Sequence, residues 1–131
     1  MPLQKNRARG GKGHFYSDQT EAAAKWILLM QAQLSRSKHI FPFPAKIPVS
    51  IDAHYIFPLP QNVSKKLIKR IEAGEIIEHV VKPDEDNLSK MIKDCMNKHV
   101  YHDDAQVWEC SGRKYYGLVP KTIITVTWRT L

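Results

Sequence analysis

The C-terminal segment 121–131, KTIITVTWRTL, constrains the fold most, because it alternates apolar and polar residues without a break. Ile124, Val126 and Trp128 fall on one face and threonines on the other, which is typical of a strand with one buried face. Segment 47–60, IPVSIDAHYIFPLP, shows the same period, and AQVWECSGRKYY at 105–116 predicts a strand that runs into a basic, aromatic turn.

Helical spacing predicts the remaining elements. SDQTEAAAKWILLMQAQLS at 17–35 and NVSKKLIKRIEAGE at 62–75 are amphipathic, and DNLSKMIKDCMNK at 86–98 has the most regular apolar face. That face comprises Leu88, Met91, Ile92, Cys95 and Met96. The order helix, strand, helix, helix, strand, strand predicts a small single α+β domain over 1–131 with a mixed sheet. Its residues 1–13 are predicted to form a flexible basic arm.

Bulk properties favour a polyanionic partner. The chain of 131 residues carries a net charge of +7, so nucleic acid is a reasonable ligand. Two cysteines, Cys95 and Cys110, are too few for a disulfide framework, and we expect a cytoplasmic protein. Apolar stretches fall short of the roughly 20 residues that span a bilayer, and the basic start leads into no apolar segment typical of a secretory signal.

Acidic residues nevertheless gather in KPDEDNLSKMIKDCMNKHVYHDDAQ at 82–106. Taken separately, Asp84, Glu85 and Asp86 are typical of a helix start, where acids cap the first turn and interact with the helix dipole. Likewise, Asp103 and Asp104 are typical of a polar turn.

Together these acids suggest a metal site. Carboxylates repel one another unless a cation or a proton intervenes, and Mg²⁺ prefers such hard oxygen ligands. Asp84 and Asp86 can point toward one centre if the backbone is extended, and the strand at 105–116 is predicted to return the Asp103–Asp104 pair to it. A metal held there activates water and neutralises charge on a phosphoryl group. Lys90, one turn after Asp86, can stabilise negative charge in the transition state.

The same stretch resembles the RusA family of Holliday-junction resolvases, whose pattern is D-x-D-N-L-x-K, an apolar helix, then D-D-x-Q. The matching positions are Asp84, Asp86, Asn87, Leu88, Lys90, Asp94, Asp103, Asp104 and Gln106. PLQKNRAR near the start and RKYYG before the last strand are similar to weaker features of the family.

This resemblance implies a homodimeric, Mg²⁺-dependent endodeoxyribonuclease that nicks four-way DNA junctions symmetrically, with Mn²⁺ as a possible substitute metal. It implies that Asp84, Asp86 and Asp104 are metal ligands and that Lys90 is the catalytic lysine. A dimer also has a physical motive, since two symmetric nicks require two sites related by a two-fold axis.

Basic residues outside this stretch are candidates for contacting the DNA backbone. They lie in the N-terminal arm, in the helix at 62–75 and in the turn after 105–112: Lys5, Arg7, Arg9, Lys65, Lys66, Lys69, Arg70, Arg113 and Lys114. For the helix, a solvated charged face is an equally good interpretation.

Three alternatives stay open. A non-catalytic DNA-binding module would use the acids as caps and would be indifferent to Mg²⁺, while a nuclease for flaps or forks would use the same chemistry on another branched substrate. Zinc is a weak alternative, because the candidate ligands lack the paired spacing of structural zinc sites. Those candidates are Cys95, His99, His102 and Cys110.

Overall fold

The computed structural model of the protein describes residues 10–17, 30, 32–34 and 41–130. Its centre is a four-stranded sheet in the order β1-β4-β2-β3, formed by β1 (Gly10–Ser17), β2 (Val49–Phe57), β3 (Val107–Tyr116) and β4 (Lys121–Arg129). β4 pairs antiparallel with β1 and β2, whereas β2 and β3 run parallel. The predicted α+β class with a mixed sheet is confirmed.

The first strand differs from the expectation for the N-terminus. Residues 10–13, predicted as the end of a flexible arm, are instead the start of β1 and pair with 126–129 of β4. This pairing satisfies backbone groups of β4 that would otherwise form an open sheet edge, which explains why a glycine-rich stretch becomes a strand. Residues 1–9 lie outside the described part of the chain.

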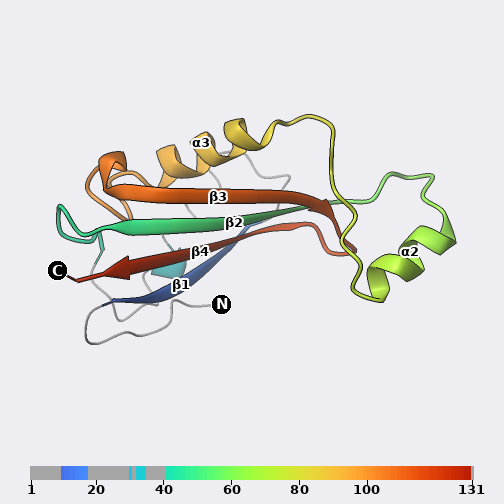
Figure 1. The fold of residues 1–131 in the computed structure, drawn as a ribbon, viewed down its shortest axis with the longest axis horizontal. Helices are drawn as coiled ribbons and strands as arrows, with labels where there is room; N and C mark the ends of the chain where they lie inside the picture. The colour runs from blue at the N-terminus through green and yellow to red at the C-terminus, as the bar shows by residue number, and fades with distance from the viewer. Residues whose placement is uncertain (1–9, 18–29, 31, 35–40, 131) are drawn as a thin grey trace.

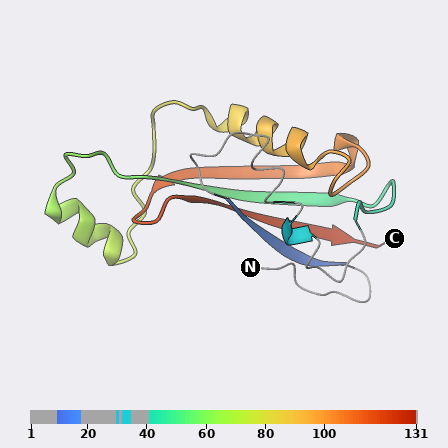
Figure 2. The same cartoon turned by 180° about the vertical axis from the view of Figure 1, so that it is seen from behind.

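One face of the sheet is covered by α3 (Glu85–Met96), which lies along β3 in both views (Figures 1 and 2). The predicted inward residues of β4, Ile124, Val126 and Trp128, are buried as expected. They join the inward side chains of β2 and α3 in one core, which includes Val49, Ile51, Ala53, Tyr55, Ile92, Cys95 and Met96.

The buried face of α3 differs from the predicted one at two positions. Met91 is 37% exposed, whereas Ser89, on the polar side of the pattern, is buried. The reason is a polar contact under the helix, where the Ser89 hydroxyl lies 3.3 Å from the Tyr55 hydroxyl. Hydrogen bonding therefore compensates the burial of Ser89.

The basic helix stands apart from this core. α2 (Lys65–Glu72) begins at Ser64, whose Oγ accepts a hydrogen bond from the Leu67 N–H, and ends before Gly74, which has a φ of 95°. No residue of α2 is buried, and the helix projects beyond the end of the sheet (Figures 1 and 2).

In the sequence, Trp26, Trp108 and Trp128 occupy apolar-face or strand positions, which predicts core packing for all three. Trp128 packs in the core, but Trp108 is 69% exposed, so the prediction is wrong there. The cause is a register shift: Val107 pairs with Val49 and Glu109 with Ser50, which leaves Trp108 outside the ladder. Trp26, and most of the helix predicted at 17–35, lie outside the described residues, although Met30 and 32–34 are helical.

None of the described helices is long and apolar enough to cross a membrane.

Candidate active site

Two carboxylates are presented at the start of α3. Asp84 is the N-cap residue with an extended backbone, and Asp86 lies in the first turn, where the helix dipole favours negative charge. Both are exposed. The Asp84 carboxylate makes no capping hydrogen bond. Asp86 Oδ1 accepts a hydrogen bond from the N–H of the next residue, Asn87, at 3.0 Å. Capping therefore does not account for Asp84.

Lys90 lies on the exposed side of α3, one turn after Asp86. Residues four apart on a helix are neighbours, so its ammonium can reach the space in front of the Asp86 carboxylate. Asp94, one turn further, is exposed as well.

The second pair of acids is held differently, in the short helix η1 (Asp104–Gln106). Asp103 and Gln106 form a capping box in which the Asp103 side chain accepts from the Gln106 N–H and the Gln106 side chain accepts from the Asp103 N–H. Gln106 is buried, and its Nε2 donates to the carbonyl oxygens of Pro44 and Ile47 at 3.0 and 3.1 Å. Gln106, which sequence reasoning assigned no role, therefore fixes this turn to the segment before β2.

Asp104 is the less satisfied member of its pair. Its Oδ1 is buried and has no hydrogen-bond partner among the described residues. The pKa of the buried Tyr101 hydroxyl is raised well above its usual range, first by burial and next by the negative charge of Asp104. A buried carboxylate oxygen without a partner is costly, and a cation or a proton donor would satisfy it.

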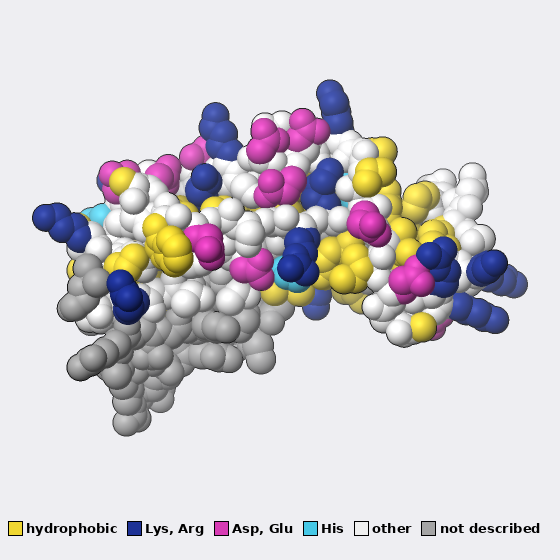
Figure 3. All heavy atoms as spheres, viewed as in Figure 1, with side chains coloured by type: hydrophobic (Ala, Val, Ile, Leu, Met, Phe, Trp, Pro, Cys, Tyr) yellow, Lys and Arg dark blue, Asp and Glu magenta, His cyan; other side chains and the backbone are white. Residues whose placement is uncertain are grey.

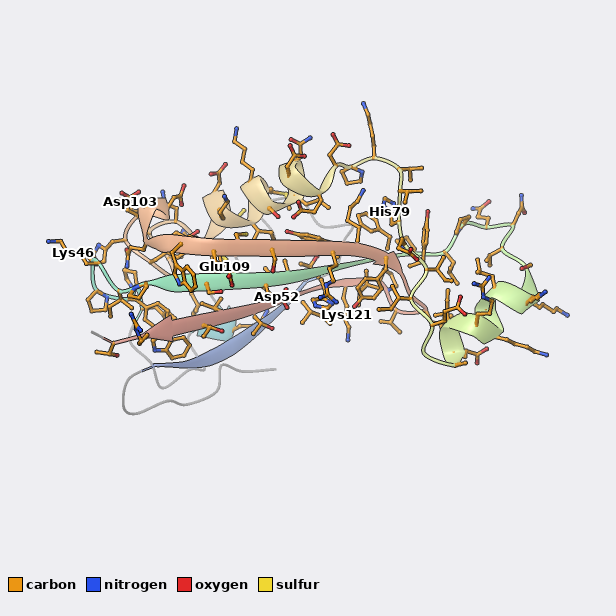
Figure 4. All side chains as sticks on the ribbon, in the orientation of Figure 1. Lys46, Asp52, His79, Asp103, Glu109 and Lys121 are labelled. Carbon is orange, nitrogen blue, oxygen red and sulfur yellow. The ribbon has the colours of Figure 1, made fainter. Side chains whose placement is uncertain are left out.

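The two acidic ends of α3 do not meet within one chain. A helix of twelve residues is about 18 Å long. The start of α3 contacts β3 near Lys114, whereas Asp104 precedes Val107 at the other end of that strand, about 23 Å away at 3.3 Å per residue. Figure 4 labels Asp103 and His79 toward opposite ends of β3, and the His79 N–H donates to the Lys114 carbonyl.

No cluster of three or more His, Cys, Asp or Glu side chains suited to a metal ion occurs among the described residues. The donor type fits a hard divalent cation, but one copy of the chain does not gather Asp84, Asp86 and Asp104. The same finding weighs against zinc at Cys95, His99, His102 and Cys110, since all four residues are described. Both cysteines are free, and burial raises the pKa of each thiol.

The predicted DNA-contacting residues fall into three groups. Lys65, Lys66 and Lys69 project from α2 into solvent, and Arg70 pairs with Glu75. In Figure 3, lysine and arginine side chains gather at the α2 end, while acids gather over α3. Arg113 is exposed on the open face of the sheet, but the Lys114 ammonium donates to two backbone carbonyls. Lys5, Arg7 and Arg9 lie outside the described residues.

Sequence reasoning missed a polar network on the face of the sheet opposite α3. His54 Nε2 lies 3.3 Å from Asp52 Oδ2, its Nδ1 lies 2.9 Å from the Tyr115 hydroxyl, and Ser111 Oγ donates to Asp52 Oδ1 at 3.1 Å. Alternation in 47–60 places residues 52 and 54 on this face. Their partners on β3 follow only from the parallel pairing of strands about sixty residues apart, which no local pattern reveals.

Comparison with known proteins adds the family. The chain matches the model of the family described as endodeoxyribonuclease RusA over residues 1–127. It is also 30% identical over 131 residues to the uncharacterized protein YqaN of Bacillus subtilis (strain 168), covering 95% of this chain and 89% of that protein.

Proposed function

Because this chain belongs to the RusA family of endodeoxyribonucleases, we propose that it is a Mg²⁺-dependent, cytoplasmic nuclease that resolves four-way (Holliday) DNA junctions by paired symmetric nicks, in DNA recombination and repair. The observation that carries the proposal is the exposed N-cap carboxylate of Asp84, which makes no capping bond, next to Asp86. An exposed carboxylate that makes no capping bond is free to bind a metal ion from solvent.

We assign the metal ligands to two copies of the chain. Asp84 and Asp86 at the start of α3 in one copy, with Asp104 of a second copy, supply the hard oxygen donors that Mg²⁺ or Mn²⁺ prefers. The buried, unpartnered Asp104 Oδ1 supports this assignment, and so does the distance between the two ends of α3. In a two-fold dimer this arrangement occurs twice, as two symmetric nicks require.

Exposed apolar side chains beside both ends support the homodimer. Val80 and Val81, before α3, and Leu118 and Val119, in the turn after β3, are more than half exposed. At the other end, Trp108 is exposed and lines a cavity of about 370 Å³ together with Asp103. An isologous contact that pairs one end with the other would cover both apolar regions.

The remaining roles follow from charge and position. Lys90 faces the same solvent as Asp86, so in a bound complex its ammonium stabilises negative charge that develops on the phosphoryl oxygens. Lys65, Lys66, Lys69 and Arg70 on α2, with Arg113 and the N-terminal Lys5, Arg7 and Arg9, neutralise DNA phosphates at a distance from the scissile bond.

The first test is cleavage of a labelled four-way junction beside a linear duplex of matching sequence, each with Mg²⁺ and with EDTA. We expect paired nicks in the junction only, dependent on Mg²⁺ and lost in Asp86→Asn while junction binding persists. Binding without any nick would establish the non-catalytic module instead. Preferential nicking of flaps or forks would establish a different branched substrate.

A mixing experiment tests the shared site. Asp86→Asn and Asp104→Asn should each be inactive alone, but a mixed dimer retains one complete site made of the unmodified ends of its two chains. Random re-association makes half of the dimers mixed, so about a quarter of the parent sites should return, as single rather than paired nicks. No recovery would place all three carboxylates of a site in one chain.

A further inference from the structure

Strand β3 contacts the chain on both sides of Asp84, through two neighbouring inward positions, Gly112 and Lys114. We refer to residues 81–86 as the entry of α3. The Lys114 ammonium donates to the carbonyl oxygen of Val81 at 2.8 Å and to that of Pro83 at 2.7 Å. The second of these carbonyls belongs to the peptide bond that continues into Asp84. A charged donor makes each bond stronger than a neutral one would be.

The contact matters because little else holds this stretch. Backbone pairing with β3 reaches only to His79, whose N–H donates to the Lys114 carbonyl at 3.0 Å. Val80 and Val81 are 83% and 58% exposed, so apolar burial contributes little to their placement. Burial and, next, the charge of Lys114 lower the pKa of His79, which agrees with an ammonium fixed close to this segment.

The second contact lies directly after Asp84. Glu85 is half-buried although Asp84 and Asp86 are exposed, and its carboxylate accepts a hydrogen bond from Ser89 Oγ. The carboxylate rests on Gly112 of β3, where an added β-carbon would overlap it. The Tyr55 hydroxyl, 3.3 Å from Ser89 Oγ, completes the polar contact under the helix.

We propose that Lys114 and Glu85 are positioning residues: β3 uses them to fix the entry of α3 so that Asp84 and Asp86 both face outward. The expected effect on nicking rests on the proposed nuclease function, whereas the placement of the entry of α3 by Lys114 and Glu85 does not. It gives Lys114 a task other than the phosphate contact that its position in RKYY predicted.

Lys114→Met, which keeps the length of the side chain and removes the ammonium, is the main test, and Arg113→Met on the opposite face of β3 is the matched control. Hydrogen exchange of the hydrogen-bonded amides of Asn87 and Leu88 should become at least about tenfold faster in Lys114→Met and stay unchanged in the control. Nicking should fall about 10- to 100-fold, as for residues that orient a metal ligand. Junction affinity in EDTA should stay within about threefold of that of the parent protein, with the same salt dependence.

Exchange unchanged from the parent would overturn the proposal. So would a loss of affinity with a salt slope reduced by about 0.9, because that is the effect of one lost phosphate contact. If the parent does not nick junctions, the proposed function fails, while the exchange comparison still decides whether Lys114 fixes the entry.

Glu85 provides an independent arm. Glu85→Ala should lower kcat with KM unchanged, and Glu85→Gln, which keeps an acceptor for Ser89, should restore most of it. Gly112→Ala displaces the same carboxylate, so the double variant with Glu85→Ala should be no worse than the worse single variant. An equal loss of kcat in Glu85→Gln and Glu85→Ala would overturn a positioning role through Ser89. This comparison decides the question even if Gly112→Ala fails to fold.

Discussion

The two ends of α3 both carry a pair of aspartates, yet the protein holds them in different ways. After the helix, Asp103 is part of a capping box with Gln106, and the turn is tied to the segment before β2. Before the helix, Asp84 makes no capping bond, and the Lys114 ammonium of β3 donates to the carbonyl of the preceding Pro83. The turn after the helix is held by Gln106, which joins it to the segment before β2, whereas the entry of the helix is held by a strand about thirty residues away.

From this difference we expect Asp103 to be a structural acid and Asp84 and Asp104 to be functional ones. A carboxylate engaged in a cap has an explanation inside the fold, as Asp103 does. A carboxylate that is exposed without a cap, like Asp84, or buried without a partner, like Asp104 Oδ1, has none among the described residues. Such groups are the better candidates for a ligand from outside the chain.

The largest expected effect contrasts the neighbours Asp103 and Asp104. Asp104→Asn should reduce junction nicking by more than about a hundredfold, beyond the usual cost of losing an outer partner of a metal ligand. Asp103→Asn is the control, because asparagine caps a helix about as well as aspartate. Initial nicking rates at saturating junction measure both; equal rates in the two variants would remove Asp104 from the site.

Gln106 tests how rigidly the second end is held. Gln106→Ala leaves two backbone N–H groups, of His102 and Asp103, and the Pro44 and Ile47 carbonyls without their partner. Because such groups are costly when buried, the free energy of unfolding should fall by about 2–3 kcal/mol. Urea denaturation measures the loss, with Ser50→Ala, which loses one exposed hydrogen bond to Glu109, as the reference. A change as small as in the reference would show that the turn does not need Gln106.

Sequence reasoning predicted the parts of the fold that depend on period and missed those that depend on pairing. The buried faces of β2 and β4 follow from alternation, so Val49, Ile51, Ile124 and Val126 were predicted correctly. β1 was missed because three glycines in 10–13 lower any local strand signal, and only pairing with β4 makes it a strand. Trp108 was misplaced because a bulge depends on the register of two strands.

The candidate site divides along the same line. The spacing of Asp84, Asp86 and Lys90 is local, and the structure presents all three at one end of α3 as the motif suggests. The relation of Asp104 to them is not local, and the geometry of one chain keeps it at the far end of the helix. The contact of Lys114 with the entry of α3 joins two segments that no motif connects.

Lys90 should have a smaller effect than the aspartates. Lys90 is exposed, so solvent and salt screen its charge. Lys90→Ala should therefore slow nicking by about tenfold, less than the roughly hundredfold loss on removing a buried oxyanion donor. Affinity for the junction in EDTA should change little. Lys93→Ala, one turn along the same helix, serves as the control, and an equal loss of rate and affinity in Lys90→Ala would make it a simple phosphate contact.

The smallest effect is expected at α2, which belongs to the same end of the molecule as the entry of α3. Lys69→Gln should lower the slope of log affinity against log salt by about 0.9 and weaken junction binding several-fold near 0.1 M salt. Stability should change by less than about 0.5 kcal/mol, because no residue of α2 is buried. Lys98→Gln, an exposed lysine after α3 at the other end, should leave the slope unchanged. Equal slopes in the two variants would show that Lys69 is only solvated and contacts no phosphate.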